Sequence, residues 1–180
     1  MSKLFIHGFG STNCTTEFGK YLKKEDFQFN WQPHDLVENT LPSKQFSDNI
    51  TEIVSMSFGA VVATLFIQKY NLKIKHSAYA PVLSFNQIIK LFFENGSPVD
   101  LVTREKLIKN NQNYYVFGES WQNGNFKVSE DFYDSLKKLE DYKVKADKIY
   151  IAQKDEILPD NYHPDGIIID NATHDFETFK

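Results

Sequence analysis

The chain has 180 residues, of which 41% are hydrophobic and 24% charged, and its formal net charge is −4. These values are typical of one soluble globular domain, and an acidic chain without a basic stripe disfavours nucleic-acid binding. The single cysteine, Cys14, excludes an intrachain disulfide, and the apolar run near the N-terminus (residues 4–6) is too short for a signal peptide or a membrane span. We therefore expect a cytoplasmic protein that binds neither nucleic acid nor a membrane.

Short apolar segments alternate with helix-like segments, as in an α/β protein with a mostly parallel sheet. The predicted strands cover residues 3–6, 27–31, 50–54, 74–80, 147–153 and 166–170. The first predicted helix begins near residue 15 and ends near residue 24. The other predicted helices cover residues 60–70, 83–93, 103–110 and 129–139. Residues 82–143 interrupt the alternation, so we interpret them as an insertion within a single domain of residues 1–180.

Residues 53–62 read IVSMSFGAVV, so an apolar strand runs through two serines into a helix. Reactive side chains in an open α/β sheet gather at the carboxyl ends of strands. A serine in a tight strand-to-helix turn needs small residues two positions before and after it. Ser55 and Gly59 meet this need around Ser57, whereas Ile53 is too bulky for the same turn around Ser55. Ser57 is therefore the candidate nucleophile, and a plain helix cap is the alternative.

A serine hydroxyl needs a base to accept its proton and an acid to orient that base. His174 follows the last predicted strand in a polar loop and is the candidate base. Asp155 follows the preceding strand and is the candidate acid, with Asp160 as an alternative farther from the strand end.

The loop HGFG at residues 7–10 leaves the first predicted strand, and its glycines allow close approach to a substrate carbonyl. The backbone N–H groups of Phe9 and Phe58 would form an oxyanion hole there. His7 is expected to brace this loop rather than to react. A plain glycine turn is the alternative.

The glycine loop and the chain order Ser57, Asp155, His174 resemble the α/β-hydrolase superfamily over nearly the whole chain. The resemblance implies a serine hydrolase without a metal or a diffusible cofactor. It also implies a minimal α/β-hydrolase fold of about six mostly parallel strands with flanking helices, in which residues 82–143 form a short helical lid. Compared with the family, we expect this chain to lack the first two strands and the closing helix, and the helix before the nucleophile strand to be reduced to about residues 43–48.

Among compact members, the HGFG opening, the nucleophile turn without its first glycine and the short lid are most similar to the methyl ester esterases of biotin synthesis. The resemblance implies hydrolysis of the methyl ester of pimeloyl-acyl carrier protein, with that acidic carrier protein as the partner. The charges fit, because residues 66–145 carry twelve Lys or Arg against nine Asp or Glu, whereas the rest carries eight against fifteen. The candidate partner-binding residues are Lys90, Arg104, Lys106 and Lys109, and the candidate acyl-pocket residues are Tyr115, Phe117 and Trp121.

Two other interpretations fit the same sequence. A different small carboxylesterase, a thioesterase or an acyltransferase would use the same three residues. A catalytically inactive hydrolase fold could instead serve as a binding module.

Overall fold

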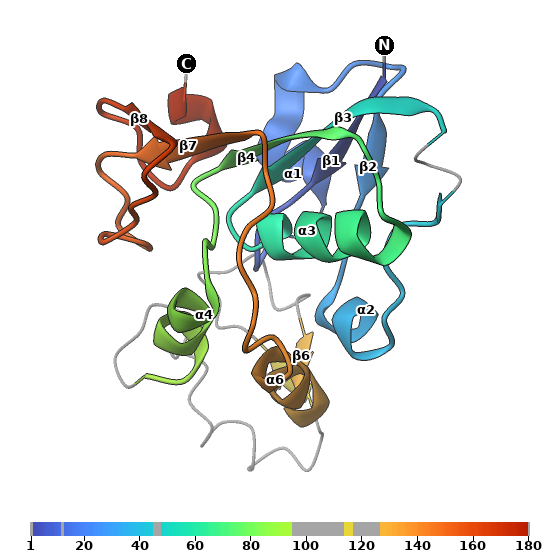
Figure 1. The fold of residues 1–180 in the computed structure, drawn as a ribbon, viewed down its shortest axis with the longest axis vertical. Coiled ribbons are helices and arrows are strands. Elements are labelled where there is room, and N and C mark those ends of the chain that lie inside the picture. Colours follow the sequence, from blue (N-terminus) through green and yellow to red (C-terminus); the bar gives the residue numbers. More distant parts are fainter. Residues whose placement is uncertain (1, 12, 45–47, 95–113, 117–126, 180) are drawn as a thin grey trace.

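The computed structural model describes residues 2–11, 13–44, 48–94, 114–116 and 127–179. In this part of the chain one sheet has six strands in the order β2-β1-β3-β4-β7-β8, and every neighbouring pair is parallel (Figure 1). The strands are β1 (Ser2–Ile6), β2 (Phe27–Phe29), β3 (Ile50–Met56), β4 (Lys75–Tyr79), β7 (Lys148–Ala152) and β8 (Gly166–Ile169). The predicted parallel α/β sheet is confirmed.

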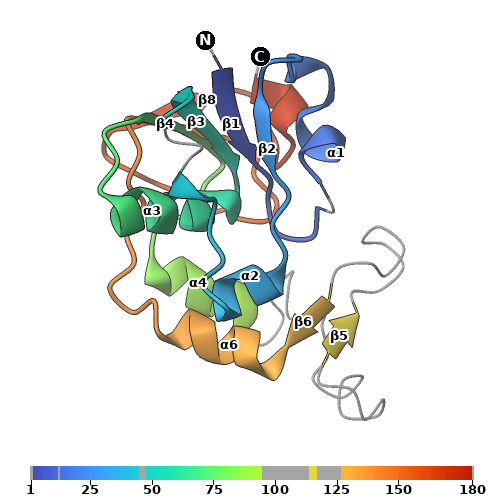
Figure 2. The same ribbon diagram turned by 90° about the vertical axis from the view of Figure 1, so that its right-hand side faces the viewer.

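Helices cover both faces of the sheet. Successive side chains of a strand point to opposite sides, so each strand contributes side chains to a core on either face. On β1, Leu4 and Ile6 belong to the core beneath α3 (Gly59–Tyr70), whereas Phe5 belongs to the core on the other face. That second core includes α1 (Cys14–Phe18) and the 3-10 turn η4 (Phe176–Phe179). Figure 2 shows α1 and α3 on opposite sides of the sheet.

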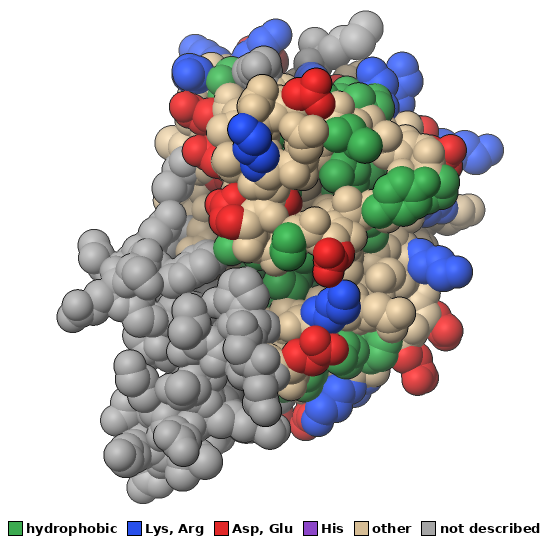
Figure 3. Space-filling view, turned by 90° about the vertical axis from the view of Figure 1, so that its left-hand side faces the viewer, with side chains coloured by type: hydrophobic (Ala, Val, Ile, Leu, Met, Phe, Trp, Pro, Cys, Tyr) green, Lys and Arg blue, Asp and Glu red, His purple; other side chains and the backbone are tan. Residues whose placement is uncertain are grey.

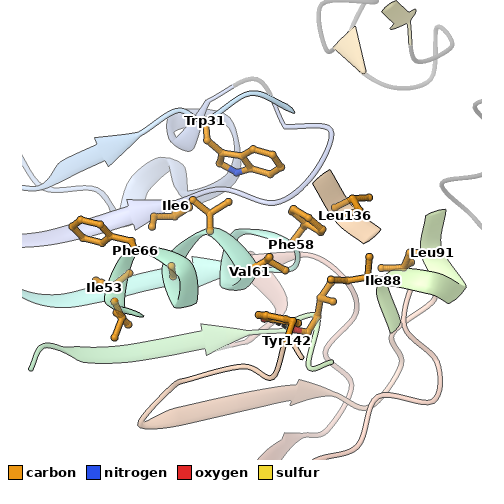
Figure 4. Close-up of a cluster of buried hydrophobic side chains, with 14 of the residues drawn as sticks. Ile6, Trp31, Ile53, Phe58, Val61, Phe66, Ile88, Leu91, Leu136 and Tyr142 are labelled. Carbon is orange, nitrogen blue, oxygen red and sulfur yellow. Dashed lines mark hydrogen bonds between the residues drawn. The ribbon is translucent and has the colours of Figure 1, made fainter. Parts of the chain in front are cut away.

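The helices of the insertion lie beyond the carboxyl ends of the strands. They are α4 (Phe85–Phe92) and α6 (Glu130–Lys137), and both views place them at that end of the sheet. Ile88 and Leu91 of α4 and Leu136 of α6 are buried in the same cluster as Phe58 (Figure 4). The insertion therefore packs directly against the end of the sheet where loops leave the strands.

The helix expected at about residues 43–48 lies partly outside the described residues: Ser43 is coil, Lys44 is in a 3-10 helical conformation and Asp48 lies in a turn. A separate short helix, α2 (Pro33–Val37), precedes this segment, and there the Gln32 N–H donates to the Asp35 carboxylate at 2.6 Å. Proline in the first turn and an acidic residue near it favour a helix start, so this signal was present in the sequence.

Other elements differ in extent. The first predicted helix is divided into α1 and the 3-10 helix η1 (Gly19–Tyr21), where Gly19 has φ +42°. A two-stranded antiparallel pair, β5 (Tyr114–Val116) with β6 (Lys127–Ser129), was not predicted. The helix predicted at residues 103–110 lies outside the described residues.

The C-terminal turn η4 packs on the same face of the sheet as α1. The ring of Phe176 packs edge-on against Phe18 of α1 and Tyr79 of β4, and the ring of Phe179 also contacts Tyr79. The residues after His174 therefore fix the end of the chain against the sheet and hold the loop that carries this histidine.

Candidate active site

Ser57 lies at the carboxyl end of β3, in a backbone conformation that a residue with a side chain rarely adopts. Its φ is +52°, in the left-handed region. The Ser57 N–H donates to the Tyr79 carbonyl at 2.9 Å, and the Ser57 carbonyl accepts from Ala60 and Val82. These hydrogen bonds to β4 and to the start of α3 hold the strained turn in place, as is common at functional sites.

Two glycines make room around this turn. A Cβ on Gly59 would lie 2.5 Å from the carbonyl oxygens of Ile6 and His7, so α3 begins in contact with the end of β1. A Cβ on Gly8 would lie 3.1 Å from Ser57 Cβ. The end of β1 and the loop after it therefore contact the nucleophile turn so closely that little space is left for a side chain at Gly8 or Gly59.

The structure brings Ser57, His174 and Asp155 together. His174 Nε2 lies 2.8 Å from Ser57 Oγ, and His174 Nδ1 lies 2.9 Å from both carboxylate oxygens of Asp155. A carboxylate only accepts, so the Nδ1 hydrogen points to Asp155 and Nε2 is left to accept the Ser57 hydroxyl proton. This arrangement can activate a serine hydroxyl.

Asp155 is buried and held by its own loop. Its Oδ1 accepts the N–H groups of Ile157 at 2.9 Å and Leu158 at 2.7 Å. These bonds fix the carboxylate in the orientation that receives His174. The alternative acid, Asp160, has an 87% exposed side chain near Lys90.

The loop after β1 is braced by buried side chains. Trp31 Nε1–H donates to the His7 carbonyl at 2.7 Å, and His7 Nδ1–H donates to the Gly8 carbonyl at 2.8 Å. Burial lowers the pKa of His7 to about 4, so the ring is neutral near pH 7. The expectation that His7 supports this loop fits these contacts, and Gly10 completes the turn with φ +87°.

The two residues whose N–H groups were predicted to form the oxyanion hole, Phe9 and Phe58, are held by their side chains. Their ring centroids lie 5.9 Å apart. Phe92 of α4 packs edge-on against both rings, and Phe132 of α6 stacks on Phe9 with a centroid separation of 5.7 Å. Both α4 and α6 therefore help to position the backbone beside Ser57.

A pocket of about 330 Å³ opens above Ser57 and His174. Its apolar lining is formed by Phe9, Phe58, Leu91, Phe92 and Ile157. The sequence analysis did not assign Leu91 and Ile157 to a pocket, because an aliphatic side chain gives no chemical signal. The pocket is suited to an apolar acyl group.

The polar lining includes two acidic residues that the sequence analysis did not single out, Glu17 of α1 and Glu156. Glu17 Oε2 accepts the Gly8 N–H at 2.6 Å, and Glu156 Oε2 accepts the His174 backbone N–H at 3.2 Å. Burial raises the pKa of Glu17, an effect that the Gly8 N–H and nearby His174 partly oppose. The position of Glu17 depends on α1 packing on the sheet, which no local sequence pattern reveals.

Most of the predicted substrate and partner residues cannot be placed. Phe117, Trp121, Arg104, Lys106 and Lys109 lie outside the described residues, and Tyr115 lies in β5, whose side chains are also outside them.

Lys90 is the predicted partner residue that the structure describes. It lies on α4 with its side chain 57% exposed, and its Nζ is 3.7 Å from Asp160. It is adjacent in sequence to Leu91 of the pocket wall and lines a neighbouring pocket of about 320 Å³. Figure 3 shows the face of the molecule that carries β8 and α4, where charged side chains of both signs surround hydrophobic ones.

Among the described residues, no group of three or more His, Cys, Asp or Glu side chains is placed to hold a metal ion. No helix within the described ranges has both the length and the apolar character needed to cross a membrane.

No protein-family model and no curated protein sequence matches this chain. Among solved structures, the crystal structure of the Paleococcus ferrophilus monoacylglycerol lipase is similar, with a TM-score of 0.57 and 12% sequence identity. The match covers 97% of this chain and 86% of the lipase chain. At this identity the likeness concerns the fold.

Proposed function

We propose that this chain, which has the α/β-hydrolase fold, is a serine carboxylesterase. The observation that carries the proposal is the continuous set of hydrogen bonds from Ser57 Oγ through His174 to Asp155. In the proposed reaction Ser57 Oγ attacks the carbonyl carbon of an ester while His174 Nε2 accepts its proton. Asp155 keeps the imidazole in the required tautomer and stabilises the imidazolium that forms.

The negative charge that develops on the carbonyl oxygen is received by the N–H groups of Phe9 and Phe58. Such a donor contributes about 3 kcal/mol to transition-state stabilisation. His174 then protonates the departing alcohol, and a water molecule attacks the acyl-serine in a second step that regenerates Ser57 and releases the carboxylic acid.

For the substrate we propose the methyl ester of pimeloyl-acyl carrier protein. The apolar lining of the pocket suits the methylene chain of such an acyl group. The basic character of residues 66–145 and exposed Lys90 near the pocket suit an acidic carrier. The cytoplasmic location belongs to the same proposal, with the single cysteine, Cys14, buried in the core.

A fluorophosphonate probe tests the enzyme class. The probe should form a covalent adduct on Ser57, detected by peptide mass spectrometry, and the Ser57→Ala protein should form none. Ser55→Ala is the matched control, because Ser55 Oγ is bonded to His76 Nε2 at 2.7 Å and lies away from the pocket. A folded wild-type protein without an adduct would favour the inactive binding module.

The substrate is tested by comparing kcat/KM for the carrier-bound methyl ester with kcat/KM for p-nitrophenyl esters and for an acyl thioester. A marked preference for the carrier-bound ester supports the biotin assignment. Preference for a small ester or a thioester would contradict it and retain the esterase or thioesterase alternative. Complementation of a strain that lacks its own pimeloyl ester esterase, grown without biotin, provides the test in cells.

A further inference from the structure

The nucleophile and the acid of the proposed esterase lie on separate segments, and His174 fits between them. A second connection between these segments does not involve His174. Gln87 of α4 donates through its Nε2 to Asn161 Oδ1 at 3.0 Å, although 74 residues separate the two along the chain. Asn161 belongs to the loop after β7, which also carries Asp155. A helix of the insertion is thus hydrogen-bonded directly to the loop that presents the acid.

Backbone groups fix the orientation of both side-chain amides in this pair. Gln87 Oε1 accepts the Leu83 N–H, so the NH₂ group of Gln87 faces Asn161. Asn161 Nδ2 donates to the Pro81 carbonyl at 3.1 Å, so its Oδ1 faces Gln87. An N–H group can only donate and a carbonyl can only accept, so neither amide can be reversed without losing hydrogen bonds. The amide pair therefore closes a ring of contacts between residues 81–83, α4 and the loop after β7.

On the side of the acid, the loop after β7 connects the amide pair to the carboxylate. The Asn161 N–H donates to the Leu158 carbonyl at 3.0 Å, and the Leu158 N–H donates to Asp155 Oδ1 at 2.7 Å. Leu158 is 6% exposed and belongs to the same core cluster as Ile88 and Leu91 of α4. A displacement of Asn161 would therefore move the turn whose N–H groups orient Asp155.

On the side of the nucleophile, the same ring of contacts includes the segment that holds Ser57. Val82 lies between the two residues whose backbone groups bind the amide pair, and it is fully buried. Its N–H donates to the Ser57 carbonyl at 3.2 Å. Lys90 and Asp160 also connect α4 with the loop after β7, but both side chains are exposed, and such an ion pair contributes little. The amide pair is therefore the stronger link between the two sides.

We propose that Gln87 and Asn161 are positioning residues, which hold the loop after β7 at the separation from Ser57 that His174 spans. The inference rests on the proposed esterase function. His174 must lie within hydrogen-bonding distance of Ser57 and of Asp155 at once, so a shift of the loop breaks one of the two contacts. A displacement of about 1 Å near the reacting groups can cost about 10²-fold in rate. The effect should fall on kcat, because neither amide is among the described residues that line the pocket above Ser57.

The test compares kcat and KM for an activated ester in wild type, Gln87→Ala, Asn161→Ala and the double variant. Each single variant should lose about tenfold or more in kcat, with KM changed by less than about threefold. The double variant should lose no more than the worse single variant, because either substitution breaks the same contact. Asn86→Ala is the matched control and should keep the wild-type kcat, since Asn86 is an exposed amide at the adjacent position of α4. Losses that add in the double variant, or a wild-type kcat in both single variants, would overturn the proposal.

Gln87→Glu separates positioning from a folding failure of the alanine variants. Its carboxylate keeps an acceptor for the Leu83 N–H, but it has no N–H to donate to Asn161. We expect a loss of kcat similar to that in Gln87→Ala, at a free energy of unfolding closer to that of the wild type. A wild-type kcat in Gln87→Glu would contradict a role for the contact with Asn161.

Nitrogen NMR of the His174 ring tests the inference without turnover, and therefore separately from the esterase function. When the ring is neutral in the wild type, Nδ1 should carry the proton, because Asp155 accepts it. In Gln87→Glu, part of the population should change to the tautomer protonated on Nε2, and His174→Gln assigns the ring signals. A change of tautomer in a protein that hydrolyses no ester would contradict the esterase function alone. A wild-type tautomer ratio in a variant with reduced kcat would assign the loss to general stability and overturn the positioning role.

Discussion

His174 Nε2 lies 2.8 Å from Ser57 Oγ, although 117 residues separate the two along the chain. The contact follows from the parallel sheet, in which the carboxyl ends of β3, β7 and β8 open at one edge. Each of these strands is followed by a loop that carries one of the three polar groups. The arrangement therefore depends on strand order rather than on local sequence.

Replacing Asp155 by Asn should reduce kcat by about 10³–10⁴-fold. The amide can still accept the N–H groups of Ile157 and Leu158, so the loop should fold, but its NH₂ favours the wrong tautomer of His174. Steady-state kinetics with an activated ester measures the loss. Asp160→Asn is the control and should stay within about twofold, since this exposed residue lies near Lys90; an equal loss in both variants would reassign the acid.

The positions of the strand ends and the order of the residues along the chain were enough to predict that a serine, an aspartate and a histidine would lie together. Ser57, Asp155 and His174 each follow an apolar strand, and such strands are visible in a sequence. Glu17 could not be predicted in the same way, because only tertiary packing brings α1 against the loop after β1. The apolar residues of the pocket could not be predicted for a different reason, because the sequence does not distinguish Leu91 and Ile157 from the apolar residues of the core.

The short helix α2 was not predicted at its own position, although its start has a local cause. Pro33 opens the helix and the Asp35 side chain accepts the Gln32 N–H. Residue pattern alone identified α3 because eight of its residues are buried in a continuous apolar run. The apolar pattern of α3 was thus a stronger guide than the capping signal of α2, although both are present in the sequence.

Replacing Gly59 by Ala should destabilise the protein by about 2–3 kcal/mol. The added Cβ would lie 2.5 Å from the backbone carbonyl oxygens of Ile6 and His7, at the end of β1, which cannot move without disturbing the sheet. Urea unfolding followed by circular dichroism measures the free energy of unfolding. Gly19→Ala is the matched control, because its φ of +42° strains an alanine but nothing lies within 4 Å; it should cost only about 1 kcal/mol. An equal or larger loss at Gly19 would contradict the close contact at Gly59.

Replacing Phe132 by Ala should weaken both the fold and the placement of Phe9. Phe132 is fully buried on α6 and stacks on the Phe9 ring, so its truncation should cost about 3–5 kcal/mol of unfolding free energy. Because Phe9 carries a proposed oxyanion donor, kcat should fall more than KM rises. Phe66→Leu offers the comparison, as Phe66 is equally buried on α3 without contacting Phe9 in the ring pairs described. A fall in kcat of the same size there would indicate a general loss of stability.

The two buried histidines should make the fold sensitive to acid between about pH 6.5 and pH 4. Burial lowers the pKa of both His7 and His76 to about 4, from 6.5 in the unfolded chain. In this window the unfolded state binds more protons than the folded state, so stability rises with pH and is fully present above about pH 6.5. Each histidine contributes up to about 3 kcal/mol to this change, because one pKa unit corresponds to about 1.4 kcal/mol.

His76 is the better of the two to test, because it lies away from the candidate active site. Its Nδ1–H donates to the Lys145 carbonyl at 2.6 Å, so its Nε2 accepts the Ser55 hydroxyl and has no room for a second proton. In His76→Gln, the difference between unfolding free energies at pH 6.5 and pH 4.5 should be about 1–3 kcal/mol smaller than in wild type. His34→Gln, at an exposed position, should leave that difference unchanged. A His76→Gln protein with the wild-type pH dependence would show that this buried imidazole does not limit stability in acid.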